Sequence, residues 1–345
     1  MRRLFHRAGI LLAACLLFLC GCSLLPQPTE EAFAFCMDTW VSQQWRGARA
    51  KETCEEIEKA LRDLEARVSL YSETSEIAAV NAAAGKEFVP VSEDVFAILR
   101  GGYAVCEETN GLFDITIAPL SLLWDVTGEN PRVPSDEEIA AAQERIGYRD
   151  LLFDDENRAV MLAREGMLLD LGGAAKGYAA GKMREIAEKN KVSGYLSIGG
   201  NMLVIGKKAD RSDYVIGLRD PLGDETDYFA TVAIDGLTMA TTGGYERWFE
   251  ADGVRYHHVL DPFTGRPSTQ DLLAVTVISE DGLLADCLST AIFLQGSAGL
   301  EKAFERTDCM VLAVTDTGDV YASEGFWERL SVPQDSAYTF HHDFN

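Results

Sequence analysis

Asp286 and Thr290 carry oxygen atoms that could bind a divalent metal ion, and they lie four residues apart in an otherwise apolar stretch. Residues four apart share one face of an α-helix, and Ser289 places a second hydroxyl beside them. A carboxylate with hydroxyls provides the hard oxygen ligands that Mg²⁺ prefers. A metal would also pair an acid that is set among apolar residues. The alternative is a helix-start carboxylate stabilised by the helix dipole.

The segment 169–178, with the sequence LDLGGAAKGY, is typical of a strand that passes through a Gly-Gly turn into a helix. Glycines allow the backbone to approach a ligand closely, and a helix N-terminus offers free N–H groups to an anion. Lys176 adds a positive charge in the first turn. The Gly-x4-Gly-Lys-Ser/Thr spacing of a Walker loop is missing. A tight turn followed by a solvated lysine explains the same residues, so the alternatives are evenly matched.

Two adjacent histidines, His257 and His258, lie in the segment 255–265, RYHHVLDPFTG. Neighbouring residues of a strand face opposite sides, so we do not expect both to bind one metal. One that faces a cavity could act as a general base near neutral pH, with Asp261 as an orienting carboxylate. Packed or exposed strand histidines are the alternative.

The elements that must position these residues follow from hydrophobic periodicity and turn signals. Helices are predicted at 49–68, 92–111, 135–147 with the capping box Ser135/Glu138, after the glycines at 172–173, and at 283–295. Strands are predicted at 33–46, 160–169, 195–205, 272–279, 309–315 and 319–323, with alternating, antiparallel strands within 214–242. Strands and helices do not alternate regularly, which predicts an α+β fold with antiparallel sheets and packed helices.

The N-terminus predicts export. Arg2, Arg3 and Arg7 precede an apolar stretch, residues 8–19, that is too short for a typical membrane span. The stretch ends in Leu-Cys-Gly-Cys, which resembles a bacterial lipobox in which Cys22 is acylated, for example with palmitate. An uncleaved anchor, or an ordinary signal peptide with an incidental cysteine, is the alternative. We therefore predict a signal peptide at 1–21, a tether at 22–32, one catalytic domain at 33–330 and a solvated tail at 331–345.

Charge and cysteine usage exclude several classes of function. The chain of 345 residues has 55 Asp and Glu against 31 Lys and Arg, a net charge of −24, which argues against a nucleic-acid partner. The same charge argues against docking on anionic lipid headgroups, so acyl chains should provide membrane attachment. Outside the N-terminal segment the cysteines are scattered, without a CxxC pair, at 36, 54, 106, 287 and 309. We expect buried thiols rather than a disulfide framework or a zinc site.

Taken together and in this order, the segments resemble the ApbE family of FAD:protein FMN transferases. The resemblance runs from Met37-Asp38-Thr39, through Ser75-Glu76-Ile77, Asn81, GLFDIT at 111–116 and ATTGGYER at 240–247, to Thr290. The chain departs from the family's commoner pattern at Asp38, Ala118 and 242–244, where Gly, Gly and Ser-Gly-Asp are frequent. These departures concern the preference for a dinucleotide or an acceptor more than the reaction class.

The resemblance implies a single ApbE-like domain and a reaction. With Mg²⁺, FAD is cleaved to AMP, and FMN is attached through a phosphoester to a Ser or Thr of an acceptor protein in a membrane redox complex. The implied metal ligands are Gly173, through its carbonyl, with Asp286, Ser289 and Thr290. The implied base is His258, with Lys176 addressing the diphosphate. The FAD site would be lined by Met37, Leu112, Phe113, Asp114, Asp170, Lys176 and Leu260.

Two other functions are consistent with the same residues. Water in place of the acceptor hydroxyl would make the protein a metal-dependent FAD pyrophosphatase. A lipoprotein that binds FAD without turnover is the second, although a metal ligand set together with a histidine favours catalysis. In each case we expect a lipid-anchored protein on the extracytoplasmic side of the bacterial cytoplasmic membrane.

Overall fold

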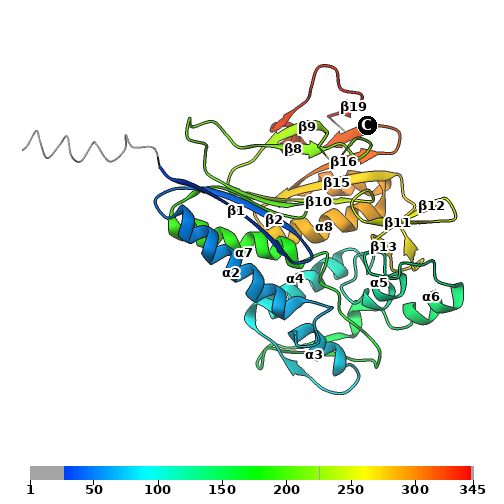
Figure 1. Cartoon of the computed structure of the whole chain (residues 1–345). Coiled ribbons are helices and arrows are strands. Elements are labelled where there is room, and N and C mark those ends of the chain that lie inside the picture. Colours follow the sequence, from blue (N-terminus) through cyan, green and yellow to red (C-terminus); the bar gives the residue numbers. More distant parts are fainter. Residues whose placement is uncertain (1–26, 225, 343–345) are drawn as a thin grey trace, which may run out of the picture.

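Within residues 27–224 and 226–342, which the computed structural model describes, a nine-stranded sheet runs through the centre of the protein (Figure 1). Its strands pair antiparallel except for the last two, β17 and β19. In spatial order they are β1 (Thr29–Cys36), β2 (Thr39–Arg46), β6 (Ser193–Ile198), β7 (Asn201–Ile205), β10 (Leu237–Gly243), β15 (Leu272–Ser279), β16 (Cys309–Thr315), β17 (Asp319–Ala322) and β19 (Thr339–His341). The predicted signal peptide and Cys22 lie outside the described residues.

Three helices pack against one face of this sheet, namely α2 (Ala50–Val68), α7 (Ala175–Asn190) and α8 (Gly282–Gln295) (Figure 1). The buried residues of α2 recur every three or four positions, so a single stripe of the helix faces the core. By contrast, α8 is buried almost all round, because it lies between the sheet, α7 and α4 (Glu93–Glu108). No single helix in the described part of the chain is both long and apolar enough to cross a membrane. Among the same described residues, α8 joined to Ser297–Phe304 passes by length and composition, and that pair is bent by 120°.

The opposite face of the sheet is covered by a second hydrophobic cluster. It includes residues from a three-stranded sheet, β18-β9-β8, formed by Leu330–Ser331, Tyr228–Ala233 and Val215–Arg219, and from the short helix α10 (Glu324–Trp327). Most of the remaining elements lie beyond the helical layer, on the side away from the central sheet (Figure 1). The remaining elements are α3 (Glu76–Ala82), α5 (Ala118–Trp124), α6 (Asp136–Gln143), α9 (Leu300–Phe304), β3 (Val89–Pro90), β4 (Leu151–Asp154), β5 (Ala159–Leu162), β11 (Trp248–Ala251), β12 (Val254–His257), β13 (Leu260–Asp261) and β14 (Arg266–Pro267).

The α+β fold with antiparallel sheets and packed helices is confirmed, as are the predicted helices and the Ser135/Glu138 capping box. Several predictions were wrong. Residues 195–205 form two paired strands, β6 and β7, rather than one, and the strand predicted at 160–169 ends at Leu162. Residues 33–46 form a hairpin rather than one strand, because the chain reverses at Met37 and Asp38, both with positive φ. The tail is not simply solvated, since β19 extends the central sheet and His341 stacks on Tyr321. The first strand also begins at Thr29, inside the predicted tether.

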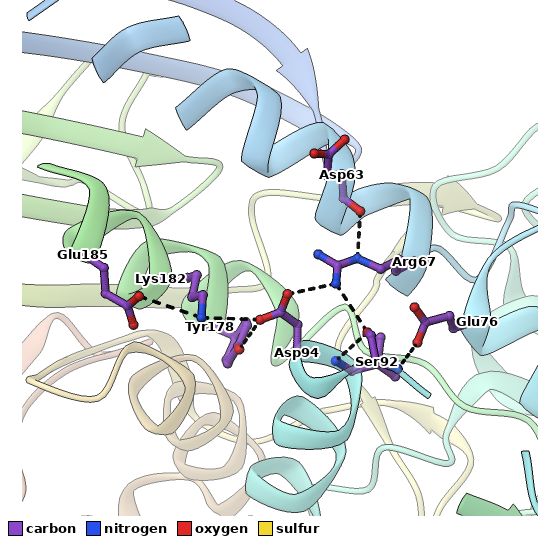
Figure 2. Close-up of polar contacts among 9 residues, drawn as sticks. Asp63, Arg67, Glu76, Ser92, Asp94, Tyr178, Lys182 and Glu185 are labelled. Carbon is purple, nitrogen blue, oxygen red and sulfur yellow. Dashed lines mark hydrogen bonds and ion pairs between the residues drawn. The ribbon is translucent and has the colours of Figure 1, made fainter. Parts of the chain in front are cut away.

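Asp94 ties α2, α4 and α7 together on the outer side of the helical layer (Figure 2). Its carboxylate lies 2.9 Å from Arg67 Nη1 of α2 and accepts a hydrogen bond of 2.7 Å from the Tyr178 hydroxyl of α7. Lys182, one turn further along α7, lies 3.6 Å away. This junction fixes the first turns of α7, which carry Lys176, relative to the rest of the helical layer.

The Asp94 junction should make stability depend on pH. Burial opposes the charged form of Asp94, but the Tyr178 hydrogen bond and the Arg67 and Lys182 charges outweigh it and lower the pKa below its ordinary value of 3.8. A carboxylate with a lowered folded-state pKa stabilises the fold above its unfolded pKa and loses this contribution as the pH falls through the folded value. Asp94→Asn should therefore lower the free energy of unfolding by about 2 kcal/mol at neutral pH. The difference in unfolding free energy between the variant and wild type should shrink in acid. Denaturant unfolding at neutral and at acidic pH measures it.

Candidate functional site

A cavity of about 710 Å³ lies where the helical layer, the ends of several strands of the central sheet and the 112–126 segment meet. The predicted site residues come to this cavity from far apart in the sequence. Those that line it are Met37, Leu112, Phe113, Asp114, Asp170, Gly173, Lys176, His258, Leu260, Asp286 and Thr290. A volume of this size is in the range of small-molecule sites, which span roughly 300–1,000 Å³.

Asp286 is held at the crossing of α7 and α8. Its Oδ2 accepts a hydrogen bond of 2.9 Å from the Gly177 N–H, in the first turn of α7, and its Oδ1 accepts one of 3.1 Å from Asn201 Nδ2. Asp286 is 5% exposed and lines the cavity. One of the N–H groups that this helix N-terminus could offer to an anion is thus already bound by a carboxylate.

Three hydroxyl groups cluster beside Asp286. Thr290, one turn further along α8, lies 3.1 Å from Thr242 Oγ1, and Thr242 lies 2.7 Å from Ser289 Oγ. Thr290 lines the cavity as predicted, but the structure places Ser289 behind the cavity wall, fully buried and donating to the Asp286 carbonyl at 2.8 Å. Because Ser289 bonds back to the Asp286 carbonyl, its hydroxyl faces the helix backbone rather than the cavity. Ser289 supports Thr290 through Thr242.

The donor set of this end of the cavity fits Mg²⁺. The Asp286 carboxylate and the Thr290 hydroxyl are hard oxygen donors, and Gly173 lies beside Thr290, since a Cβ on Gly173 would be 3.7 Å from Thr290 Oγ1. Mg²⁺ is usually held by one or two carboxylates together with waters and substrate phosphates. Among the described residues, no three His, Cys, Asp or Glu side chains come together as a metal site, so Asp286 would be the one carboxylate ligand beside hydroxyl and carbonyl oxygens. The five cysteines are buried and free, as predicted.

The Gly-Gly turn orients its own polar groups. Asp170 accepts hydrogen bonds from the Gly172 N–H and the Ser121 hydroxyl, both at 2.8 Å, and Lys176 Nζ donates to the Gly172 carbonyl at 2.7 Å. Lys176 also lines the cavity, in the first turn of α7 as predicted. The turn thus brings a cation and a backbone carbonyl to the end of the cavity that holds Asp286.

Gly177 allows α7 and α8 to approach each other closely. A Cβ on Gly177 would lie 2.1 Å from the Gly282 carbonyl oxygen and 2.5 Å from Asp286 Cβ. Gly177→Ala should therefore force the helices apart and lower the free energy of unfolding by about 3 kcal/mol. Thermal unfolding would measure this loss. Gly181→Ala is the matched control on the same helix, because its Cβ would meet only Gly282 N, at 3.9 Å. It should stabilise the protein by about 0.5–1 kcal/mol, and an equal loss in both variants would contradict the role of the crossing.

The two histidines have separate surroundings, as predicted. His257 accepts from the Val259 N–H, bonds to the Ser268 carbonyl at 2.9 Å and packs against Phe293. His258 lines the cavity, and its Nδ1 lies 3.2 Å from the Arg247 carbonyl. A carbonyl only accepts, so Nδ1 carries the proton and Nε2 of the neutral ring has a free lone pair.

The surroundings of His258 lower its pKa, and one prediction about this residue was wrong. Burial, reinforced by the positive charge of Arg247, lowers the pKa of His258 to about 3, so it does not titrate near neutrality in the substrate-free protein. Asp261 does not orient the ring, because its carboxylate accepts from the Phe263 and Thr264 N–H groups of the following turn. The orienting group is the backbone carbonyl of Arg247.

Arg247 links His258 to the β1–β2 hairpin. Its guanidinium donates two hydrogen bonds to Asp38, one of 2.9 Å to the carboxylate and one of 2.7 Å to the backbone carbonyl oxygen. Asp38 has a φ of +56°, a conformation that suits the glycine common at this position in the family that the sequence resembles. In this chain the hairpin tip therefore carries a carboxylate that pairs with a cation of the cavity.

Sequence reasoning missed several polar residues of the cavity, among them Asn201, Arg219 and Glu246. Confinement within the cavity raises the pKa of Glu246 against the effect of nearby cations, which include Lys176. The segment 240–247, which contains Glu246, is part of the family resemblance, and the glycines at 199–200 could have marked Asn201. No local sequence pattern shows which distant residues lie opposite the Gly199-Gly200 turn in the cavity.

Asp114 lines the cavity, but its carboxylate is already occupied by hydrogen bonds within the protein. Its carboxylate accepts from the Thr116 N–H and hydroxyl at 2.8 and 2.7 Å and from the Tyr148 N–H at 3.0 Å. Burial raises its pKa although these bonds oppose the shift. Asp114 also lines a smaller neighbouring cavity of about 420 Å³. We assign it a structural role in the 111–117 loop.

Comparisons with known proteins identify relatives of this chain. Residues 37–313 match the ApbE family. Relatives named FAD:protein FMN transferase include one from Klebsiella pneumoniae, 34% identical over 266 residues, which cover 76% of this chain and 82% of the relative. Another, from Treponema pallidum, is 31% identical over 302 residues, with 83% of each chain covered.

Solved structures share the fold. The ApbE protein of Thermotoga maritima superposes with a TM-score of 0.82 and 36% identity over 88% of this chain and 99% of its own. The flavinyl transferase ApbE of Pseudomonas stutzeri gives a TM-score of 0.78 and 29% identity, with 89% and 98% covered.

Proposed function

As a member of the ApbE family, the chain is a transferase that moves FMN from FAD to a protein, and we propose that it does so with Mg²⁺ and the residues of the 710 Å³ cavity. The observation that carries the proposal is that Asp286, Thr290, Gly173 and Lys176 line this cavity close together. Asp286 binds the N–H of Gly177, the residue after Lys176, and Gly173 lies beside Thr290. Attack on a diphosphate requires neutralisation of phosphoryl charge and a positioned nucleophile more than covalent catalysis. Lys176 and the oxygen donors at this end of the cavity serve the first need, and the acceptor protein supplies the nucleophile.

The proposed reaction is an exchange at the FMN phosphorus. The oxygen of an acceptor Ser or Thr hydroxyl forms a bond to phosphorus, the bond to the bridging oxygen breaks, and AMP leaves with that oxygen. His258 Nε2, which has a free lone pair, takes the hydroxyl proton. Lys176 binds the diphosphate oxygens. Asp286, Thr290 and the Gly173 carbonyl would hold Mg²⁺, which, when bound, stabilises charge on the phosphoryl oxygens.

Binding of FAD should also make His258 a stronger base. The cations Arg247 and Lys176 contribute to the low pKa of His258 in the substrate-free cavity. An anionic diphosphate beside these cations offsets their effect, because an opposite charge near an imidazolium favours it. The basicity of His258 therefore rises when the substrate arrives.

We also propose that the protein acts on the extracytoplasmic side of the bacterial cytoplasmic membrane, anchored through acylated Cys22. The sequence of the N-terminal segment supports this, and the acceptor would then be a protein of a membrane redox complex. Labelling cells with palmitate tests the anchor. Wild type should incorporate label and fractionate with membranes, whereas Cys22→Ser should do neither; labelling of both would reject Cys22 as the acylated residue.

The test of the reaction is incubation of the protein with FAD, Mg²⁺ and an acceptor domain, followed by intact-mass measurement. An acceptor that gains one FMN supports transfer. FMN that appears only free in solution indicates that water replaces the acceptor hydroxyl, and the protein is then a pyrophosphatase. FAD that stays intact indicates binding without turnover.

A further inference from the structure

Asn201 makes a buried contact with the carboxylate of Asp286 that the reaction described above does not use. It is the first residue of β7, 1% exposed, and its Nδ2 donates to Asp286 Oδ1 at 3.1 Å. The Gly177 N–H binds the other carboxylate oxygen at 2.9 Å. Each oxygen of Asp286 thus has one fixed donor, and these two donors determine the rotation of the carboxylate about its own axis.

The orientation of the Asn201 amide follows from chemistry. A carboxylate offers only acceptors, so the group that faces it must be the NH₂ and not the carbonyl oxygen. One donor on each carboxylate oxygen leaves further lone pairs for a cation, because a carboxylate accepts about four contacts in all. A carboxylate that binds a metal is commonly held by such hydrogen bonds.

The backbone of Asn201 is held on both sides. It pairs with Ile198 of β6 and with Ala240 of β10, in the interior of the nine-stranded sheet. The preceding turn consists of Gly199 and Gly200, with φ of +44° and +87°, and it lines the cavity. These positive angles suit glycine. The side chain of Asn201 is therefore presented to Asp286 from a rigid strand end rather than from a mobile loop.

We propose that Asn201 is a positioning residue for the divalent cation, which fixes the Asp286 carboxylate so that its free lone pairs face the cavity. This inference rests on the proposed function, because it assumes that Asp286 binds the metal. Loss of a hydrogen-bond partner of a metal ligand typically costs about 10–100-fold in metal affinity. Asn201→Ala should therefore weaken metal binding by that factor.

Asn190 provides a matched control. It is also a buried asparagine, 4% exposed, whose Nδ2 donates to a carboxylate, Glu56, at 3.3 Å. In both residues Oδ1 is buried without a hydrogen-bond partner among the described residues. Asn190 lies at the other end of α7 and does not line the cavity. Its replacement by alanine should cost comparable stability without an effect on the metal.

The experiment measures binding of Mn²⁺ to FAD-loaded protein by the loss of the free-ion EPR signal, with FAD alone subtracted. Asn201→Ala should bind Mn²⁺ about 10–100-fold more weakly than wild type, and Asn190→Ala should bind like wild type. Excess Mg²⁺ should restore much of the transfer rate of Asn201→Ala, which it would not do for a misfolded protein. Asn201→Ser, which also lacks the amide, keeps the test open if the alanine variant does not fold.

The outcomes separate this inference from the proposed function. If wild type binds no Mn²⁺, the metal site itself is rejected, and the role of Asn201 with it. If wild type binds Mn²⁺ and Asn201→Ala binds it equally well, only the positioning role is rejected. An equal loss in Asn190→Ala would attribute the effect to general destabilisation and would also reject the positioning role.

Discussion

Asp286→Ala is expected to lower Mg²⁺-dependent FMN transfer by several orders of magnitude. Asp286 is the charged member of the proposed metal site, beside Thr290 and Gly173. Metal stabilisation of phosphoryl charge contributes several kcal/mol, and each ~1.4 kcal/mol corresponds to a tenfold rate change. The measurement is the initial rate of acceptor labelling at saturating FAD over a range of Mg²⁺ concentrations. Excess Mg²⁺ should not restore the rate, because the ligand itself is gone.

Two further variants separate the lost metal ligand from a disturbed fold. Asp286 also accepts hydrogen bonds from Gly177 and Asn201, so alanine removes structural contacts as well. Asp286→Asn keeps the shape and one acceptor oxygen but removes the charge, and it should show a similar loss of rate with a smaller loss of stability. Asp281→Asn changes a carboxylate on the same helix that caps Leu283 and Leu284 outside the cavity. It should remain active, and a near-normal rate in Asp286→Ala would reject the metal assignment.

Local patterns predicted the elements that carry the site. The three- and four-residue spacing of apolar side chains predicted α2, and the helix face shared by Asp286 and Thr290 follows from helix geometry alone. The Gly-Gly turn before α7 was likewise visible in the sequence. In each case the signal lies within a few residues of the feature that it predicts.

The contacts that tune the site could not be predicted in the same way. Asn201 and Asp286 are 85 residues apart, and only the packing of α8 on the central sheet brings them together. The group that orients His258 is a backbone carbonyl, which carries no sequence signal, whereas Asp261 is close in sequence but is bound by its own turn. The hairpin turn at Met37 and Asp38 lacks the Asn-Gly or Asp-Gly signature of such turns. The family resemblance, rather than residue spacing, connected these segments.

His258→Ala is expected to slow transfer by about 10²–10⁴-fold, the usual contribution of a general base, while FAD binding stays near wild type. The pH dependence provides a second readout. Burial lowers the pKa of His258 to about 3 in the free protein, so it adds no acid limb to kcat/KM between neutral pH and pH 5. The limb in kcat, which reports the substrate complex, should lie at higher pH, because the diphosphate offsets Arg247 and Lys176.

His257→Ala is the matched control for this prediction, since it removes the neighbouring imidazole, which packs on Phe293 away from the cavity. It should lower thermal stability more than it lowers the rate of the chemical step, whereas His258→Ala should do the reverse. A single-turnover measurement with pre-bound FAD distinguishes the two. If His258→Ala binds FAD poorly but transfers the bound FMN at the wild-type rate, His258 is a structural histidine, and another group of the cavity, with Glu246 the first to test, must accept the proton.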